Sequence, residues 1–162
     1  MQEALDFRTS LLSSEGCSFV CDVEADYGEK VYSFSLLCRC DDDGAEMQII
    51  APENIAGITA TVCDGETTLS FDGVRLEYGN LANGYVAPLA CPWLLTGAWS
   101  EDYIAYAGAD GDATRVTWLR GYNDEELTID TWFSSQIPVF AEISYDGQRV
   151  LTIKIRDFIL EK

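Results

Sequence analysis

The sequence predicts a mainly β (α+β) fold in which one large antiparallel sheet curves into an unclosed barrel. Apolar and polar residues alternate with a period of two over most of the chain, and short turns containing glycine separate the alternating segments. Helical spacing of apolar residues occurs at the start of the chain and again near its middle. We therefore expect an N-terminal helix and a mid-chain helical lid on the concave face of the sheet.

The first part of the chain reads as a helix followed by a hairpin. Gln2–Leu12 has the spacing of a short amphipathic helix. Apolar residues then occupy the odd positions of Cys17–Tyr27 and the even positions of Val31–Cys40. Pairing Tyr27 with Lys30 matches odd with even positions, so both apolar sets share one face. Cys17 then faces Cys40.

Three further strands continue this apolar face. Two Asp-Gly turns, which favour tight hairpins, separate Ile58–Cys63, Thr67–Phe71 and Val74–Tyr78. Two-residue loops place Ala60 opposite Leu69 and keep the apolar residues of all three strands together.

The alternation stops in the middle of the chain. We expect Gly79–Ala87 to be a loop. We expect Pro88–Trp99 to be a short apolar helix, or a loop followed by a helix, that covers the sheet, because this segment is too apolar to lie free in water. Alternation then resumes in Tyr103–Ala107, Ala113–Arg120, Glu126–Phe133, Val139–Tyr145 and Val150–Phe158.

Composition excludes several classes of function. At 162 residues the chain has the size of one domain, so we expect a single domain over 1–162. The 28 acidic residues against 10 basic ones argue against nucleic acid as a partner and favour a monomer or weak dimer. The chain has no histidine, which removes the commonest general base and zinc ligand. We expect neither an enzyme nor a protein with a metal or cofactor.

Four of the six cysteines fall on the apolar face of the first hairpin. Cys17 and Cys40 face one another, and Cys21 lies diagonal to Cys38. Buried thiols, cross-strand disulfides and a four-thiolate zinc site are all compatible with this pattern. The spacing lacks the paired CxxC of a zinc ribbon.

The last third of the chain resembles a known family. Thr128–Phe133 leads into Ile137-Pro138, and Ala141-Glu142-Ile143 is followed by Asp146-Gly147; Val150–Ile155 and Asp157-Phe158 then close the chain. Together with the order of elements, this resembles the LolA/LolB-like lipoprotein family, in particular LolA-like lipoproteins of Gram-positive bacteria and the spore-germination lipoproteins.

The resemblance implies an extracytoplasmic protein, anchored as a lipoprotein to the outer face of the cytoplasmic membrane. The sequence contains no lipobox and no lipidated first cysteine. The chain is either cytosolic or preceded by a targeting segment, and we expect the signal and anchor to precede Met1. Lipoprotein shuttling is not implied, because no basic patch or arginine at the cavity is evident in the sequence.

We expect a hydrophobic half-barrel cavity that holds a lipid acyl chain or a lipidated or apolar protein segment. The alternative is a structural or interaction protein whose acidic surface docks on a membrane-associated partner. The expected cavity has a wall on the strands and a lid on the mid-chain helix. The wall is Phe19, Phe34, Leu36, Met47, Ile49, Ile58, Leu69 and Phe71, and the lid is Trp93, Leu94, Leu95 and Trp99.

Overall fold

The computed structural model describes residues 1–63, 66–71, 74–79, 81–82, 85–86, 88–121 and 126–162, and over most of 66–88 it describes the backbone alone. Two α-helices, α1 (Gln2–Leu12) and α2 (Cys91–Ser100), and two 3₁₀ turns, η1 (Glu53–Ile55) and η2 (Pro88–Ala90), accompany the strands. The strands are β1 (Gly16–Asp26), β2 (Val31–Asp41), β3 (Gly44–Ala51), β4 (Thr59–Cys63), β5 (Glu66–Phe71), β6 (Val74–Gly79), β7 (Leu81–Ala82), β8 (Tyr85–Val86), β9 (Tyr103–Asp110), β10 (Ala113–Arg120), β11 (Leu127–Ser134), β12 (Ile137–Tyr145) and β13 (Gln148–Glu161).

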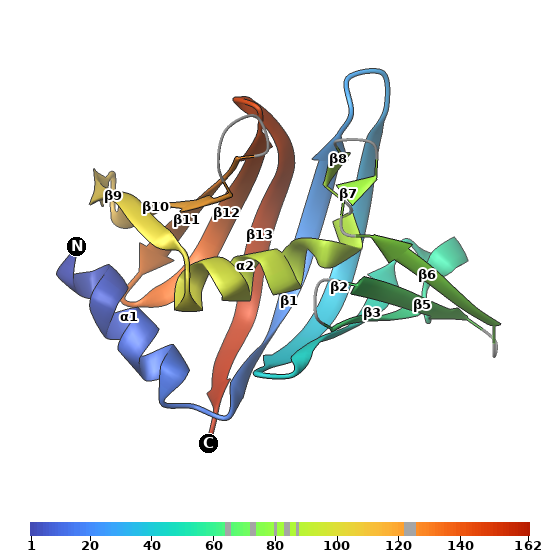
Figure 1. Cartoon of the computed structure of the whole chain (residues 1–162), viewed down its shortest axis with the longest axis horizontal. Helices are drawn as coiled ribbons and strands as arrows, with labels where there is room; N and C mark the ends of the chain where they lie inside the picture. Colours follow the sequence, from blue (N-terminus) through green and yellow to red (C-terminus); the bar gives the residue numbers. More distant parts are fainter. Residues whose placement is uncertain (64–65, 72–73, 80, 83–84, 87, 122–125) are drawn as a thin grey trace.

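One antiparallel sheet dominates the molecule. Its 11 strands follow the order β6-β5-β4-β3-β2-β1-β13-β12-β11-β10-β9, so β6 and β9 are open edges and the sheet does not close into a barrel (Figure 1). The predicted fold class is therefore confirmed. The expected loop over Gly79–Ala87 is partly wrong, because Gly79 ends β6 and the segment also contains the small β7–β8 pair. Two residues per strand are too few to show a period of two in the sequence.

The registers are those that the hairpin patterns predict. Cys17 pairs with Cys40 in the first hairpin, and Ala60 pairs with Leu69 between β4 and β5. Because partners across an antiparallel ladder share a face, the apolar residues of neighbouring strands form one continuous surface.

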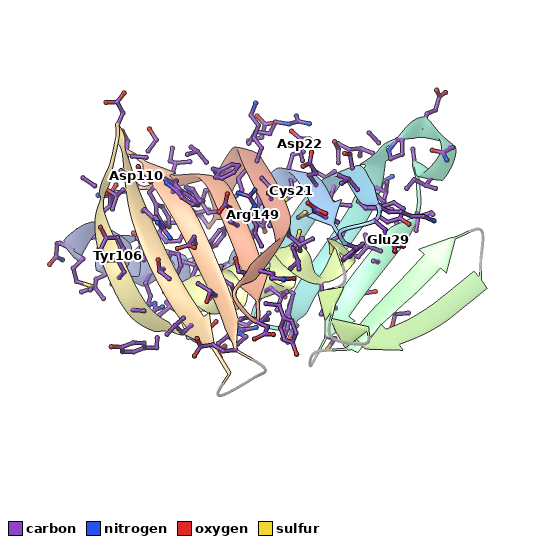
Figure 2. All side chains as sticks on the ribbon, turned by 90° about the horizontal axis from the view of Figure 1, so that it is seen from above. Cys21, Asp22, Glu29, Tyr106, Asp110 and Arg149 are labelled. Atoms are coloured by element: carbon purple, nitrogen blue, oxygen red, sulfur yellow. The ribbon has the colours of Figure 1, made fainter. Side chains whose placement is uncertain are left out.

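That surface is the concave face of the sheet, and α2 covers it. The helix crosses in front of β13, β1 and β2 (Figure 1), and Leu95, Ala98 and Trp99 are completely buried. On β1, neighbouring residues alternate between the two faces: Cys21 is buried on the side of α2, whereas Asp22 lies on the outer side (Figure 2). The predicted lid over Pro88–Trp99 is thus present as η2 and α2.

The first and last strands, β1 and β13, pair in the middle of the sheet. β1 and β13 pair from Gly16 opposite Glu161 to Ala25 opposite Leu151, with one irregularity after Ser18. The remaining strands extend from this central pair in two groups, β2 to β6 on one side and β12 to β9 on the other.

Candidate functional site

The predicted wall and lid lie against one another on the concave face. Most of their members belong to the buried core, and Ile58 is half-buried beside it. The side chains of Leu69 and Phe71 lie outside the described residues, although β5 carries both on its backbone. The buried members are Phe19, Leu36, Met47, Ile49, Leu94, Leu95 and Trp99.

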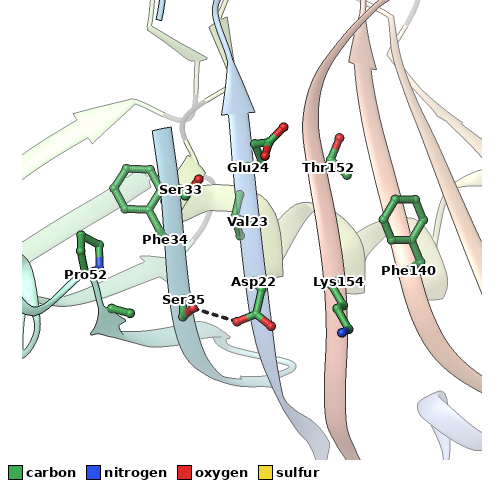
Figure 3. A pocket seen from close by; sticks show the side chains of 11 residues that line it. Asp22, Val23, Glu24, Ser33, Phe34, Ser35, Pro52, Phe140, Thr152 and Lys154 are labelled. Atoms are coloured by element: carbon green, nitrogen blue, oxygen red, sulfur yellow. Dashed lines mark hydrogen bonds between the residues drawn. The ribbon is translucent and has the colours of Figure 1, made fainter. Parts of the chain in front are cut away.

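Two predicted site residues, Phe34 and Trp93, are half-buried and border surface hollows. Phe34 reaches the rim of a hollow of about 440 Å³ on the outer face of the sheet, where Asp22, Phe140 and Lys154 contribute side chains (Figure 3). The Asp22 carboxylate is already hydrogen-bonded within the protein, because it accepts from Ser35 at 2.7 Å and from Arg156 at 3.0 Å. The Arg156 hydrogen bond lowers the pKa of the Asp22 carboxyl.

Trp93 borders a second hollow, of about 330 Å³, between α1, α2 and the turn that joins β2 to β3. Its lining is mixed: Leu11 and Trp93 are apolar, whereas Asp42, Asp43 and Glu101 are acidic. This hollow reaches the buried Cys17 and Cys40, so it leads from solvent toward the thiol-bearing part of the concave face.

The C-terminal end of α2 is held by an arginine of α1. Arg8 donates from Nε to the carbonyl of Trp99 at 2.7 Å, and from Nη2 to the carbonyls of Ala98 at 3.0 Å and Asp102 at 2.8 Å. The last carbonyls of a helix lack partners within the helix and carry partial negative charge, so a guanidinium is well suited to bind them. Burial lowers the pKa of Arg8, and Asp102 opposes that shift.

A second arginine, Arg120 of β10, holds the same end of the helix from the sheet. It pairs with Asp102 at 2.9 Å, and its guanidinium lies 5.0 Å from the centre of the Trp93 ring. A Cβ at Gly97 would meet the guanidinium of Arg120, so a larger residue there would require the Arg120 side chain to move. Burial raises the pKa of the Asp102 carboxyl, and the positive charge of Arg120 acts against this.

Trp99 fixes the helix end in the core. Its Nε1 donates to Oγ1 of Thr131 at 3.0 Å, and both residues are fully buried. The indole packs edge-on against Phe7 with ring centres 5.6 Å apart, and it also contacts Phe19 and Phe158. Together with Arg8 and Arg120, these contacts make the C-terminal end of α2 a fixed point.

The cysteines of the first hairpin are buried on the side of the sheet that α2 covers, and Cys17 and Cys40 line the hollow beside Thr96 and Gly97 of the helix. Cys91, the first residue of the helix, is fully buried. Burial raises the pKa of the Cys21 thiol. All six cysteines are free, and Cys63 is the exposed one. Within the described part of the chain, no three cysteine, histidine or acidic side chains are arranged to hold a metal ion.

Arg8, Arg120 and Thr131 are the residues that sequence reasoning missed. Arg8 and Thr131 contact backbone or side chains about 90 and 32 positions away in sequence, so no local pattern reveals them. One sequence signal could have drawn attention to Arg8: the chain has only 10 basic residues, and Arg8 directly follows the apolar Phe7 in the amphipathic helix.

Comparison with known proteins gives a likeness at the level of structure. No protein-family profile and no curated protein matches the sequence. The fold is similar to an outer membrane lipoprotein-sorting protein domain from Vibrio parahaemolyticus, with a TM-score of 0.57, 4% identity, and coverage of 99% of this chain and 92% of that one.

Two further solved structures are similar over nearly the whole chain. A DUF1329 family protein from Desulfovibrio piger has a TM-score of 0.53 and 9% identity, with 98% of this chain and 90% of that one covered. A LolA superfamily protein from Nitrosomonas europaea has a TM-score of 0.51 and 9% identity, with 99% and 93% covered. The curved unclosed sheet and its helical lid thus confirm the resemblance seen in the sequence: the chain has the LolA-like fold.

Proposed function

We propose that this protein binds an apolar ligand, the acyl chain of a lipid or an apolar protein segment, between the concave face of the sheet and α2. The observation that carries the proposal is that a separate, apolar helix, rather than a second sheet, covers the apolar face. Leu94 and Leu95 of this helix pack in the same core as Leu36 and Ile49 of the wall.

The way in which α2 is attached supports its role as a lid. Polar contacts to Arg8 and Thr131 hold its C-terminal end, and Arg120 contacts both Asp102 beyond that end and Trp93 in the first turn. Cys91, Leu94 and Leu95 are buried in the apolar core. Removal of apolar surface from water is worth about 25 cal/mol per Å² whether a helix or a ligand covers it. An acyl chain therefore offsets part of the apolar burial that the sheet loses when α2 moves aside.

The proposed setting is the outer side of the cytoplasmic membrane, in keeping with the fold shared with a lipoprotein-sorting domain. No helix among the described residues is long and apolar enough to cross a membrane. We propose binding, without catalysis, as the activity of the concave face.

A titration with a fluorescent fatty acid, whose emission rises in apolar surroundings, tests the proposal. The neighbouring residues Ile49 and Ile50 of β3 form a matched pair, because Ile49 is buried on the concave side and Ile50 is 42% exposed. We expect Ile49→Gln to weaken binding about 10- to 100-fold, the equivalent of one buried aliphatic side chain, and Ile50→Gln to leave it unchanged.

Circular dichroism of both variants confirms that they fold, and mass spectrometry of gently purified protein identifies any lipid that remains bound. Absence of saturable binding by the wild-type chain would contradict the proposal. Equal weakening by both substitutions would also contradict it, because the side chain of Ile50 lies on the opposite face of the sheet.

The acidic surface supports a second candidate, docking on a membrane-associated protein partner. The observation that favours it is the net charge of −18, to which Asp42 and Asp43 beside the second hollow contribute. Such docking depends on charge, so it weakens steeply with added salt and is insensitive to Ile49→Gln.

A further inference from the structure

Two cysteines lie directly opposite one another at the open end of the first hairpin. Cys17 of β1 and Cys40 of β2 are Cα partners, in a register that runs without a shift to the pair nearest the tight turn, Asp26 and Val31. The two cysteines are 1% and 2% exposed, and both thiols are free. The proposed binding of an apolar ligand makes no use of this pair.

The hydrogen-bonding pattern of the hairpin sets the spacing of the pair. The backbone N–H of Tyr27 donates to the carbonyl of Lys30, so these two residues form a hydrogen-bonded pair. Pairs of this kind recur at every second residue, and Cys17 lies an even number of residues before Tyr27, so Cys17 and Cys40 form one as well. The Cα atoms of such a pair are about 5.5 Å apart, within the range of about 4.4–6.8 Å that a disulfide spans.

The other two thiols of the hairpin do not meet this condition. Cys21 lies opposite Leu36, and Cys38 lies opposite Phe19, so Cys21 and Cys38 are diagonal neighbours. Diagonal positions in an antiparallel pair are about 7–8 Å apart, beyond the usual range of a disulfide. Within the hairpin, Cys17 and Cys40 are therefore the cysteines that can bond without a shift of the backbone.

The two strands also approach closely at this end of the hairpin. Gly16 precedes Cys17 with a φ of 139°, which side-chain-bearing residues rarely adopt, and a Cβ there would collide with the backbone carbonyl of Cys40. Glycine thus lets β1 begin directly against β2, beside the two thiols. The neighbouring Cys17 thiol, and then burial, raise the pKa of Cys40, in agreement with this proximity.

The second hollow gives a small molecule a route to the pair. Cys17 and Cys40 line it together with Thr96 and Gly97 of α2, and its volume is about 330 Å³. We propose that Cys17 and Cys40 are a redox-active pair, which forms a disulfide across the open end of the hairpin by exchange with a low-molecular-weight disulfide that enters this hollow.

The exchange proceeds in two steps. The thiolate of one cysteine attacks the incoming disulfide, which forms a mixed disulfide and releases one thiol. The thiolate of the other cysteine then attacks the protein sulfur of the mixed disulfide, which forms the Cys17–Cys40 bond and releases the second thiol. The cysteines lose two electrons, which reduce the incoming disulfide, and the two protons that the cysteines lose end on the released thiols.

The charge of the hollow favours a cationic disulfide. Asp42, Asp43 and Glu101 line it, and Asp42 and Asp43 are exposed. Carboxylates at the entrance raise the local concentration of a cation and lower that of an anion, and salt screens this effect.

The test is oxidation of the reduced full chain with cystamine, a cationic disulfide, in a Cys63→Ala background that removes the exposed thiol. Alkylation, trypsin without reductant and mass spectrometry follow. Cleavage after the basic residues places Cys17 in peptide 9–30, Cys38 in 31–39, Cys40 in 40–75 and Cys91 in 76–115. We expect a species in which 9–30 is bridged to 40–75.

Peptide 9–30 also contains Cys21, so the bonded residue has to be assigned. Fragmentation between Cys17 and Cys21 assigns it without any substitution. Cys17→Ala and Cys40→Ala abolish the bridge, whereas Cys21→Ala and the matched control Cys38→Ala retain it, and circular dichroism verifies that each variant is folded. A bridge through Cys21, or the absence of a bridge between 9–30 and 40–75, overturns the proposal, whether or not the chain binds a fatty acid.

The route is tested by comparing cystamine with 2-hydroxyethyl disulfide, which is uncharged. At 0.01 M NaCl we expect the bridge to form about 10-fold faster with cystamine, and the ratio to fall as salt is added. Asp42→Asn with Asp43→Asn should lower the ratio, whereas Glu24→Gln with Glu29→Gln, an equal change of charge nearer the turn of the same hairpin, should not. Equal ratios in the two double variants overturn the route through this hollow.

Oxidation also closes a loop from residue 17 to residue 40, which restricts the unfolded chain. We expect the melting temperature to rise by about 5–10 °C on oxidation, to return with dithiothreitol, and to be independent of redox state in Cys40→Ala. A bridge that leaves the melting temperature unchanged overturns the role of the bond in securing the end of the hairpin.

Discussion

Trp99 and Trp118 are the two largest fully buried side chains, and they differ in one hydrogen bond. Nε1 of Trp99 donates to Thr131, whereas Nε1 of Trp118 is buried and has no hydrogen-bond partner among the described residues. Both indoles pack at a steep angle against a phenylalanine, Phe7 for Trp99 and Phe133 for Trp118. The pair thus separates the contribution of a polar contact from that of aromatic packing.

We expect Trp99→Phe to lower the free energy of unfolding by about 1–3 kcal/mol more than Trp118→Phe does. The first substitution leaves the buried hydroxyl of Thr131 without its donor, and the second removes a donor that is already unsatisfied. Urea denaturation followed by far-UV circular dichroism measures both values. Equal destabilisation would show that the indole–hydroxyl hydrogen bond adds no stability.

The sequence predicts the concave-face residues of β1 to β3 well, because burial of one face imposes a period of two that can be read locally. It predicts neither the Arg8 nor the Arg120 contacts of α2. Those contacts depend on how α2 crosses the sheet, which separate apolar patterns do not specify.

At the scale of the element, α2 is a short helix whose stability depends on its surroundings. Ten residues are too few for a helix to be stable alone in water, so tertiary contacts must supply the difference. The sequence predicts that Pro88–Trp99 is helical and covered, from its apolar character. It gives no indication of which end is fixed, because the carbonyls of Ala98 and Trp99 are bound by a residue of another element.

We expect Arg8→Met to destabilise the fold by about 2–3 kcal/mol, because three backbone carbonyls lose a charged donor. Methionine retains much of the apolar stem, so lost packing contributes little. Arg149→Met is the control, since Arg149 pairs with Glu142 on the exposed outer face, where an ion pair adds little stability.

Hydrogen exchange read by mass spectrometry locates the effect. Arg8→Met should increase exchange in 91–102 more than elsewhere, and Arg149→Met should not. Uniform exchange throughout the chain would mean that Arg8 stabilises the whole fold and does not act on α2 in particular.

At the scale of the whole molecule, charge is the dominant feature. The net charge of −18 is spread over 162 residues, and the Arg–carboxylate ion pairs of the described outer face neutralise a small part of it. Mutual repulsion of so many carboxylates disfavours the compact state.

We therefore expect the melting temperature to rise between 0.01 and 0.15 M NaCl, as the Debye length falls from about 30 Å to about 8 Å. Thermal denaturation by circular dichroism at pH 7 measures the change. A fall in melting temperature over this range would show that the ion pairs outweigh the repulsion, because salt weakens both.

The pairing of β1 with β13 has a consequence for how the chain is made. Asp22 and its partner Arg156 are 134 positions apart, and this long-range pair lies at the centre of the sheet, where both groups of strands join. On the ribosome, β1 and β13 cannot pair until β13 has emerged, so the nascent chain cannot complete the centre of its sheet before synthesis is nearly finished. A chain that is translocated across a membrane before β13 is synthesised would cross without this central strand pair.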